Sequence, residues 1–280
     1  MNFPNVAAIH DLSGFGRCAL TVVIPVLSAM GIQVMPLPTA LLSTHTGGFD
    51  DFTFLDLTDQ MEKISDHWSE LDLKFNSIYS GFLGSEAQVD TVTRFIRRFK
   101  ADDTIVLIDP VMGDNGVLYA TITEGIKNKM KSLAQHADIL TPNITEAFFL
   151  LDMPVTEPTE SLITDMLYRL SELGADKIVI TGIHIDTDYV GTASYDKHDG
   201  VPVLYNRKSI HKHYPGTGDI FSSVLLGRMM SGSDLTSAAR TASDFVYDVI
   251  ADTALYNLPE RNGVLLEKNL YRLIPEFDHK

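Results

Sequence analysis

Short apolar runs rich in β-branched residues alternate along the chain with longer stretches that have the apolar period of helices. The short runs predict strands at 6–10, 32–37, 77–80, 105–109, 139–141 and 177–181. The longer stretches predict helices at 19–30, 85–100, 161–173, 220–230 and 235–250. Strands and helices that alternate in this way are typical of a parallel sheet covered on both faces. The pattern therefore predicts an α/β protein.

The region after residue 188 departs from this alternation. Two tyrosine-bearing runs at 189–195 and 203–209 flank the turn signal His198-Asp199-Gly200. They predict an antiparallel hairpin at one edge of the sheet. The chain contains no linker rich in Pro, Gly or Ser and no internal repeat. We therefore expect one domain over residues 1–280.

Charge and cysteine content narrow the classes of partner. The formal net charge of the chain is −15, and such a surface repels phosphate backbones and anionic membranes. One cysteine cannot form an internal disulfide, which fits a reducing compartment. The first basic residue is Arg17, and no apolar run approaches the length of a membrane helix. These features predict a cytoplasmic protein with no nucleic-acid or membrane partner.

Polar and glycine-bearing segments follow the ends of five predicted strands. Ligands of open α/β sheets bind at the carboxyl ends of the strands, so we expect these segments to face one crevice. They lie at 10–16, 80–84, 109–114, 141–146 and 181–182.

The first of these segments contains GFGRCA at 14–19, which fits the dinucleotide-binding pattern G-x-G-x-x-A. That pattern also needs an acidic residue at the end of the second strand, and the next acids here are Asp50 and Asp51, well beyond it. The segment therefore favours a substrate-binding turn over an oxidoreductase site. Cys18 is expected to be a small buried residue of the following helix.

The sequence GTGD at 216–219 opens the predicted helix at 220–230. Backbone N–H groups at a glycine turn, together with the positive end of a helix, form an anion site suited to a phosphoryl group in transfer. Asp219 can accept the proton of an attacking hydroxyl at such a site, although an isolated aspartate there often only caps the helix. The P-loop pattern is absent. The combination favours phosphoryl transfer.

Asp109, Asp114 and Glu146 form a second acidic group. Nucleotide phosphates bring Mg²⁺, which proteins usually hold through water and one or two carboxylates. Asp109 ends a hydrophobic strand, and Glu146 lies one helical turn after Asn143. Either acid alone is equally well explained as a cap of a neighbouring element, but together they favour metal and phosphate binding. His211 and His213 share a strand face without a further ligand, so no zinc site is expected.

Five motifs occur in the order and at the spacing of one enzyme family: STHT at 43–46, GFLG at 81–84, DPVMGD at 109–114, TPNITE at 141–146 and GTGD at 216–219. On these motifs the chain resembles the vitamin-kinase branch of the ribokinase-like superfamily, and most closely the pyridoxal/pyridoxamine kinase family. The resemblance runs from Ile9 to about Ile250. It implies a ribokinase-like three-layer α/β/α sandwich with a mostly parallel central sheet, usually assembled as a homodimer.

The resemblance also implies an activity, which is ATP- and Mg²⁺-dependent phosphorylation of the hydroxymethyl group of a B6 vitamer. Asp219 is the implied catalytic base, and the backbone of Gly216, Thr217 and Gly218 is the implied anion hole. The residues implied for ATP are Asp109, Thr141, Asn143, Glu146, Thr181 and Gly182, with Asp114 and Glu146 on the metal side. Thr141 and Thr181 also match positions near a monovalent cation such as K⁺. The residues implied for the vitamer are Asp11, His45, Thr46, Phe82 and, as a flap, Tyr119.

Two positions depart from that family. Asp11 stands where these kinases usually carry serine, and Phe82 stands where they usually carry tyrosine. The segment DLSGFG at 11–16 also resembles the first loop of hydroxymethylpyrimidine kinases, so a pyrimidine of thiamin synthesis stays open as substrate, although His45-Thr46 argues against it. A non-catalytic α/β binding protein is the third alternative, and Asp219 beside an intact GTG argues against it, because a purely binding protein has no use for the base.

Overall fold

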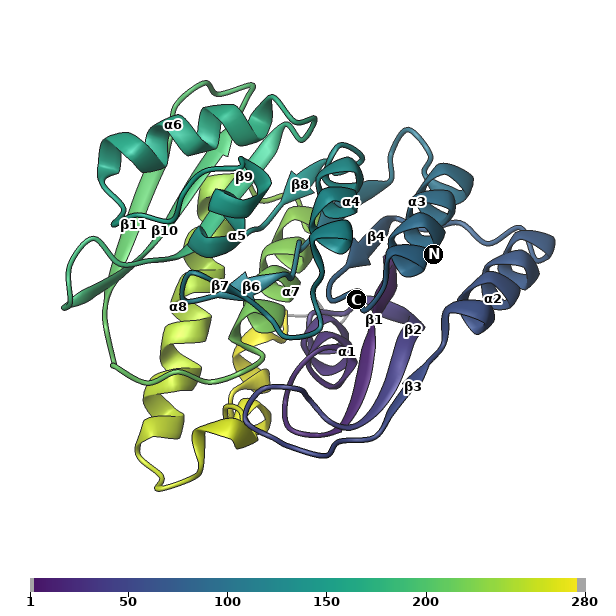
Figure 1. The fold of residues 1–280 in the computed structure, drawn as a ribbon, viewed down its shortest axis with the longest axis horizontal. Helices are drawn as coiled ribbons and strands as arrows, with labels where there is room; N and C mark the ends of the chain where they lie inside the picture. The colour runs from purple at the N-terminus through teal and green to yellow at the C-terminus, as the bar shows by residue number, and fades with distance from the viewer. Residues whose placement is uncertain (1–2, 276–280) are drawn as a thin grey trace, which may run out of the picture.

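The computed structural model describes residues 3–275 and confirms an α/β fold with a mostly parallel sheet between two helical layers (Figure 1). The strands of the large sheet are β1 (Asn5–Phe15), β2 (Gln33–Thr44), β3 (Phe54–Asp56), β4 (Ser77–Ser80), β5 (Ile105–Ile108), β8 (Ile139–Leu140), β9 (Lys177–Ile183), β10 (Tyr189–Asp196) and β11 (Val203–Lys208). Within residues 3–275 they run in the order β11-β10-β9-β8-β5-β4-β1-β2-β3. The six strands from β9 to β2 pair in parallel. The two edges are antiparallel, with the predicted β10–β11 hairpin at one of them and β3 at the other.

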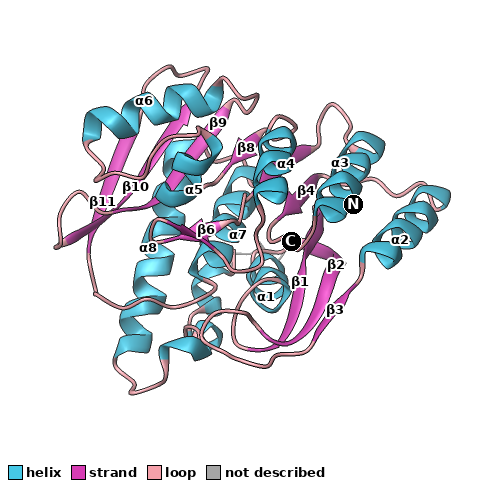
Figure 2. Ribbon diagram, in the orientation of Figure 1, coloured by secondary structure: helices cyan, strands magenta, loops and turns pink. Residues whose placement is uncertain are grey.

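Helices cover both faces of the sheet (Figure 2). One layer consists of α2 (Thr58–Glu70), α3 (Glu86–Phe99), α4 (Glu124–Ala134), α5 (Ile144–Leu150) and α6 (Glu160–Ser171). The other consists of α1 (Leu20–Ala29), α7 (Thr217–Met230), α8 (Leu235–Ala254) and the 3₁₀ turns η1 (Glu260–Asn262), η2 (Leu266–Lys268) and η3 (Leu270–Leu273). Successive strand residues point to opposite faces, so Ala7 and Ile9 of β1 enter the first core while Val6 and Ala8 enter the second.

The predicted strands are confirmed in position, but two of them are much longer than expected. β4 spans the predicted residues 77–80, whereas β1 and β2 continue to Phe15 and Thr44. The sequence pattern of β2 breaks at Pro36 and Pro38 because proline cannot donate to a ladder. In the structure these prolines pair with β1 at positions where β2 has no partner on its outer side, since β3 meets only residues 40–42.

Several elements were not expected from the sequence. They are β3, α2, α4, α5 and a small hairpin of β6 (Gly113–Asp114) and β7 (Val117–Leu118). Two helix boundaries also differ from the prediction. α7 begins at Thr217 rather than at Ile220, and α1 begins at Leu20, so the expectation that Cys18 belongs to the helix is wrong. Cys18 lies in the preceding turn, where it is buried as expected.

The large sheet takes strands from both halves of the chain. The expectation of one domain over 1–280 stays a prediction, and residues 1–2 and 276–280 of that range lie outside the described residues. Among the helices formed by residues 3–275, none combines the length and the apolar character that a membrane span requires.

Candidate active site

The parallel strands direct their carboxyl ends to one edge of the sheet, and α7 begins at the same edge. Direct contacts join four of the expected segments there. The N–H of Ala19 donates to Asp219, and the hydroxyl of Ser222 on α7 donates to Asp109 beyond β5. Asn143, which follows β8, forms an isolated bridge with Thr181 of β9. These contacts bring strand-end segments together at one edge of the sheet, and the expectation that they face one crevice stays a prediction.

The start of α7 depends on glycine at 216. Gly216 has a φ of 81°, and a Cβ there would lie 1.9 Å from the carbonyl oxygen of Arg17, so any other residue would force the two segments apart. Thr217 holds the turn by donating its hydroxyl to the carbonyl of Tyr214 at 3.1 Å. A Cβ on Gly218 would meet no atom within 4 Å, so the helix start faces open space. The first N–H groups of this helix are available to an anion.

Asp219 lies in the first turn of α7 with 16 % of its side chain exposed. The N–H of Ala19 donates to its Oδ2 at 2.8 Å. Burial raises the pKa of Asp219 to about 7; the hydrogen bond from Ala19 opposes this rise, and the nearby carboxyl of Asp11 adds to it. Ala19 holds its N–H there with a positive φ of 48°, which is rare outside glycine. The 14–19 segment is thus a turn packed against α7.

A buried chain of hydroxyls links α7 to β5 and β8. Ser222 donates to Oδ2 of Asp109 at 3.0 Å, and Oγ1 of Thr141 lies 3.0 Å from Oγ of Ser222. Because Ser222 gives its proton to Asp109, Thr141 is the donor of the second bond. Burial, together with the charge of Asp219, raises the pKa of Asp109 to about 8. The carboxyl of Asp109 is therefore held in one orientation beside the start of α7.

Glu146 caps α5, which is one of its two expected roles; the other is metal and phosphate binding. Asn143 and Glu146 form a capping box, in which Asn143 N–H donates to Oε2 of Glu146 at 2.8 Å and Glu146 N–H donates back to Asn143 at 2.9 Å. The other oxygen of Glu146 accepts the N–H of Met112 at 2.9 Å. Burial and the charge of Asp109 nevertheless raise the pKa of Glu146 well above its usual value.

These observations test whether the site fits a divalent cation. Asp109 and Glu146 are both buried, and among residues 3–275 no basic side chain affects the pKa of either carboxyl. Each carboxylate oxygen keeps a lone pair beyond the one used by the chain. Two such carboxyls fit Mg²⁺, which proteins usually hold through water and one or two carboxylates. Within residues 3–275, no group of three or more His, Cys, Asp or Glu side chains is placed to hold a metal ion.

Asp114 contacts Asn115 and His213, neither of which bonds to Asp109 or Glu146. It lies on the β6–β7 hairpin, where Oδ1 accepts the N–H of Asn115 at 2.8 Å and Oδ2 lies 3.4 Å from Nε2 of His213. His213 belongs to the loop before α7, so the pair connects that loop with the hairpin. The side chain of Asp114 is 30 % exposed.

Tyr119 follows the same hairpin, and its hydroxyl region is surrounded by acids. Burial raises the pKa of Tyr119, and the carboxyls of Glu146, Asp114, Asp109 and Asp219 raise it further. Its N–H is fixed by the carbonyl of Met112 at 2.9 Å. Tyr119 therefore lies within range of the charges of the acidic group, and its role as a flap stays a prediction.

Two of the residues expected at the vitamer, Asp11 and His45, are buried and hydrogen-bonded within the chain. Asp11 is buried and accepts the hydroxyl of Ser13 at 2.8 Å, and burial raises its pKa. His45 is buried with both ring nitrogens engaged, since Gly47 N–H donates to Nδ1 at 3.1 Å and Nε2 bonds the carbonyl of Arg261 at 2.7 Å. Neither ring nitrogen of His45 is therefore free to bond a ligand, and the ring packs against Phe49 with centroids 4.9 Å apart.

The other two vitamer residues are less fixed. Thr46 is exposed, and Phe82 is half-buried against the core of the first helical layer. On the nucleotide side, the N–H of Thr181 donates to Pro142 at 3.0 Å, and Gly182 has a φ of 66°, which brings the β9 end close to Asn143.

Three groups at this site have no expected role from the sequence: the side chain of His10, the N–H of Ala19 and the linking hydroxyl of Ser222. His10 is fully buried, and its Nδ1 lies 3.9 Å from Oδ1 of Asp219. A signal for His10 was present, because it is a polar residue at the predicted end of the first strand. The N–H of Ala19 has no such signal, since backbone geometry is invisible in side-chain patterns.

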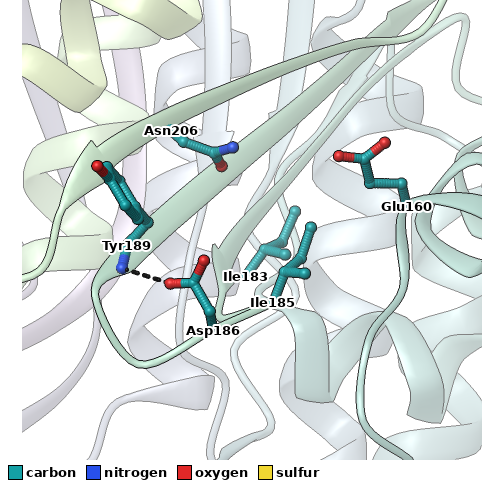
Figure 3. Close-up of a pocket in the computed structure, with 6 residues that line it drawn as sticks. All are labelled: Glu160, Ile183, Ile185, Asp186, Tyr189 and Asn206. Carbon is teal, nitrogen blue, oxygen red and sulfur yellow. Dashed lines mark hydrogen bonds between the residues drawn. The ribbon is translucent and has the colours of Figure 1, made fainter.

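A separate hollow lies beside the β10–β11 hairpin and contains none of the expected site residues. It is lined by Glu160, Ile183, Ile185, Asp186, Tyr189 and Asn206 (Figure 3). The carboxylate of Asp186 is turned to the backbone, where it accepts the N–H of Tyr189 at 2.9 Å.

Comparison with known proteins agrees with this geometry. Residues 24–263 match the family model described as phosphomethylpyrimidine kinase. A crystal form with pyridoxal of a Bacteroides thetaiotaomicron protein, named as a phosphomethylpyrimidine kinase, is 41 % identical, with a TM-score of 0.94 and coverage of 99 % of this chain and 98 % of that one. Pyridoxal kinase from Lactobacillus plantarum is 30 % identical, with a TM-score of 0.90 and coverage of 98 % and 97 %. Pyridoxal kinase of Dictyostelium discoideum is 26 % identical over 96 % of this chain and 92 % of its own. The expected ribokinase-like fold and kinase relationship are thereby confirmed.

Proposed function

Because this chain belongs to the phosphomethylpyrimidine kinase family, we propose that it transfers the γ-phosphoryl group of ATP to the 5′-hydroxymethyl group of a B6 vitamer. Pyridoxal, pyridoxamine and pyridoxine all carry that group, and the product serves salvage of pyridoxal 5′-phosphate. Two solved relatives support a B6 vitamer: the protein that is 41 % identical was crystallised with pyridoxal, and the one that is 30 % identical is named pyridoxal kinase. The observation that carries the proposal is the position of Asp219 beside a glycine-formed helix start and two buried carboxyls.

Asp219 is the proposed catalytic base. A pKa of about 7 lets its carboxylate accept a proton near neutral pH, which a carboxyl of ordinary pKa does poorly. Phosphoryl transfer passes through a loose transition state, so the base needs only to orient the hydroxyl and accept the proton as the bond forms. The hydrogen bond from Ala19 to Oδ2 leaves Oδ1 for the vitamer hydroxyl.

The backbone of Gly216, Thr217 and Gly218 is the proposed anion hole. The N–H groups and the positive end of the 14-residue α7 point to the open space in front of Gly218, where negative charge develops during transfer. Because Asp219 follows directly, base and anion hole have a fixed relation to each other.

The nucleotide and its cations are proposed to bind beside α5 and β9. Asp109 and Glu146 would hold Mg²⁺ directly or through water, with Asp114 as a further acid on the hairpin. When bound, Mg²⁺ offsets the charge of the phosphates and orients them. Thr141, Asn143, Thr181 and Gly182 are proposed to contact the phosphates, and the two threonines a monovalent cation such as K⁺.

The vitamer is proposed to bind between the ends of β1, β2 and β4. Asp11 would pair with a polar or cationic group of the ring, and the ring of His45 and the side chains of Thr46 and Phe82 would line its faces. Tyr119 would close over the reacting groups from the β6–β7 hairpin. Homodimer assembly and a cytoplasmic location remain predictions of the sequence analysis.

One observation favours a second candidate, a hydroxymethylpyrimidine or its phosphate in thiamin synthesis. The family model carries the name of that activity, and the buried carboxyl of Asp11 is equally able to pair with an aminopyrimidine. A non-catalytic binding protein is disfavoured because a carboxyl whose pKa burial raises to about 7, placed at the start of α7, suits a general base, for which binding alone has no use.

A coupled assay for ADP release tests these alternatives directly. Purified protein is supplied with ATP and Mg²⁺ and with pyridoxal, pyridoxamine, pyridoxine or hydroxymethylpyrimidine, each in turn. We expect turnover with at least one B6 vitamer, at a kcat/KM above that for the pyrimidine, and its loss in Asp219→Asn. Turnover with the pyrimidine alone would replace the proposal by its alternative, and no turnover with any substrate would favour a binding protein.

A further inference from the structure

His10 is a buried titratable residue to which the proposed chemistry assigns no role. Its side chain is fully buried, and within residues 3–275 neither ring nitrogen has a hydrogen-bond partner. Burying polar atoms without partners is costly, so such an imidazole in a native core calls for an explanation. The nearest charged atom is Oδ1 of Asp219, 3.9 Å from Nδ1 of His10.

The surroundings of His10 fix the direction of its ring. A Cβ on Gly81 would lie 2.3 Å from Nδ1, so the glycine of the GFLG motif makes room for the imidazole. Tyr79 packs edge-on against the ring, with centroids 4.4 Å apart. At the same point the ladder between β1 and β2 shifts its register between His10 and Leu12. A glycine, an aromatic edge and a strand irregularity together aim the ring at α7.

From this geometry we infer that His10 is a positioning residue, a neutral imidazole whose Nδ1–H donates to Oδ1 of Asp219 in the reacting complex. The inference rests on the proposed function, because it acts through the proposed base. A distance of 3.9 Å is too long for a hydrogen bond, but catalytic hydrogen bonds in unliganded enzymes often tighten only when substrate binds. The N–H of Ala19 already holds Oδ2, so a donor on one lone pair of Oδ1 would fix the carboxylate plane and leave the other lone pair for the vitamer hydroxyl.

The charges around His10 agree with a neutral donor. The groups that face it are Tyr79 on β4 and Asp219 on α7, and the charges of Asp109, after β5, and of Asp11 act on these two neighbours. Burial lowers the pKa of His10 to about 3, so the ring stays uncharged over the working range and does not neutralise Asp219. A hydrogen bond to the ionised form of a carboxyl favours that form, so the donor would keep Asp219 ready as a base.

The first experiment compares His10→Leu, His10→Asn and Tyr79→Phe. Leucine removes both nitrogens, asparagine keeps an N–H close to the position of Nδ1, and the Tyr79 change removes a neighbouring hydroxyl that also lacks a partner among the described residues. For His10→Leu we expect kcat to fall about tenfold, while KM for ATP and for the vitamer stays within about threefold of the parent values. In the pH profile of kcat, which reports the bound complex, the acidic limb should move up by about one pH unit. The asparagine variant should recover most of kcat, and Tyr79→Phe should leave the limb in place.

Additivity separates an effect through Asp219 from a loss of core packing. In an Asp219→Asn background, His10→Leu should change kcat by less than twofold, because the bond no longer has an ionised acceptor. A tenfold loss in both backgrounds, or equal losses in the leucine and asparagine variants without a shift of the limb, would overturn the inference.

A second measurement does not depend on activity. Nitrogen-15 NMR of the imidazoles, with His10 assigned by its absence in His10→Asn, should show a neutral ring with the proton on Nδ1 from pH 5 to 9 and a changed Nδ1 signal in Asp219→Asn. A proton on Nε2 with no response to Asp219 would refute the positioning role even in an active enzyme. If no vitamer is phosphorylated, the proposed function fails while the NMR result still decides the role of His10.

Discussion

The two sides of the site are built differently. On the proposed phosphate side, the acceptors are already hydrogen-bonded by the chain, with both oxygens of Glu146 held by N–H groups and Asp109 held by Ser222. On the proposed vitamer side, Thr46 is exposed and Phe82 is half-buried. Tyr119 directly follows β7, a strand of only two residues. His45 holds its own loop through Nδ1, which accepts the N–H of Gly47, and ties that loop to the carbonyl of Arg261 through Nε2.

This difference indicates where reaction and selectivity reside. A group held by several bonds to rigid elements keeps its geometry before any ligand arrives, which is what phosphoryl transfer needs. A side formed by loops can accept different rings with small adjustments. We therefore expect the proposed phosphate side to determine the reaction and the proposed vitamer side to determine which alcohol is accepted.

The largest expected effect comes from Asp219 at the border of the two sides. Asp219→Asn should lower kcat by about 10²–10⁴-fold while ATP binding and fold are retained, because asparagine keeps the shape but cannot accept the proton. Turnover with the preferred vitamer measures it. Asp234→Asn, which changes the N-cap of the adjacent helix α8, is the matched control and should leave kcat near that of the parent. Near-normal turnover of Asp219→Asn would remove this residue from the chemistry.

A smaller effect is expected on the phosphate side. Glu146→Gln should raise the Mg²⁺ and ATP concentrations needed for half-maximal rate by about 10- to 100-fold, with less change in vitamer KM. Glutamine can accept only one of the two N–H groups that Glu146 accepts, so the Tm should also fall.

Thr159→Ala serves as the control for the loss of a cap. Thr159 accepts the N–H of Leu162 at the start of α6, and its removal should lower the Tm without changing the Mg²⁺ requirement. If saturating Mg²⁺ leaves the Glu146→Gln defect intact and vitamer KM rises instead, Glu146 does not serve the metal.

The pH dependence offers a third test. With a pKa of about 7 for Asp219, kcat/KM should fall about tenfold per unit below pH 7. Burial raises this pKa above the unfolded value of 3.8, so the folded state binds the extra proton and loses stability as pH rises through that interval. The Tm of Asp219→Asn relative to the parent should therefore be lowest near pH 4 and increase up to about pH 7–8. A constant Tm difference across this range would contradict the raised pKa.

The smallest effect concerns selectivity on the vitamer side. Asp11→Ser should lower kcat/KM for pyridoxamine more than for pyridoxal, by up to about tenfold, because a carboxylate pairs with the aminomethyl ammonium better than a hydroxyl does. Ser13→Ala, which removes only the hydroxyl bonded to Asp11, should keep the ratio between the two vitamers. Equal losses on both vitamers together with a lower Tm would make Asp11 a structural residue.

Motifs with fixed local geometry could be predicted from the sequence. GTGD was placed at a helix start because glycine and an N-terminal acid have local reasons to be there, and α7 begins at Thr217 with Gly216 as its cap. Asn143 and Glu146 were recognised as neighbours on one helical turn, and they form a capping box. The β10–β11 hairpin followed from its turn signal.

Other features had no local signal. α5 has only seven residues, too few for a reliable helical period, and the extension of β1 and β2 depends on the two strands pairing with each other. Burial raises the pKa of both Asp109 and Asp219, and the charge of Asp219, 110 positions further along the chain, adds to the rise at Asp109.

The alternation of strands and helices, the acidic overall charge and the residue types at each strand end can be read from local sequence, because period, composition and turn chemistry act over a few residues. Three contacts arise only when the chain folds: Ala19 donates to Asp219, Ser222 joins Asp109 to Thr141, and His10 faces Asp219, the proposed base. Those contacts join residues that lie up to 209 positions apart in the chain, as His10 and Asp219 do. They arise when parallel strands gather their ends at one edge, which no local pattern encodes.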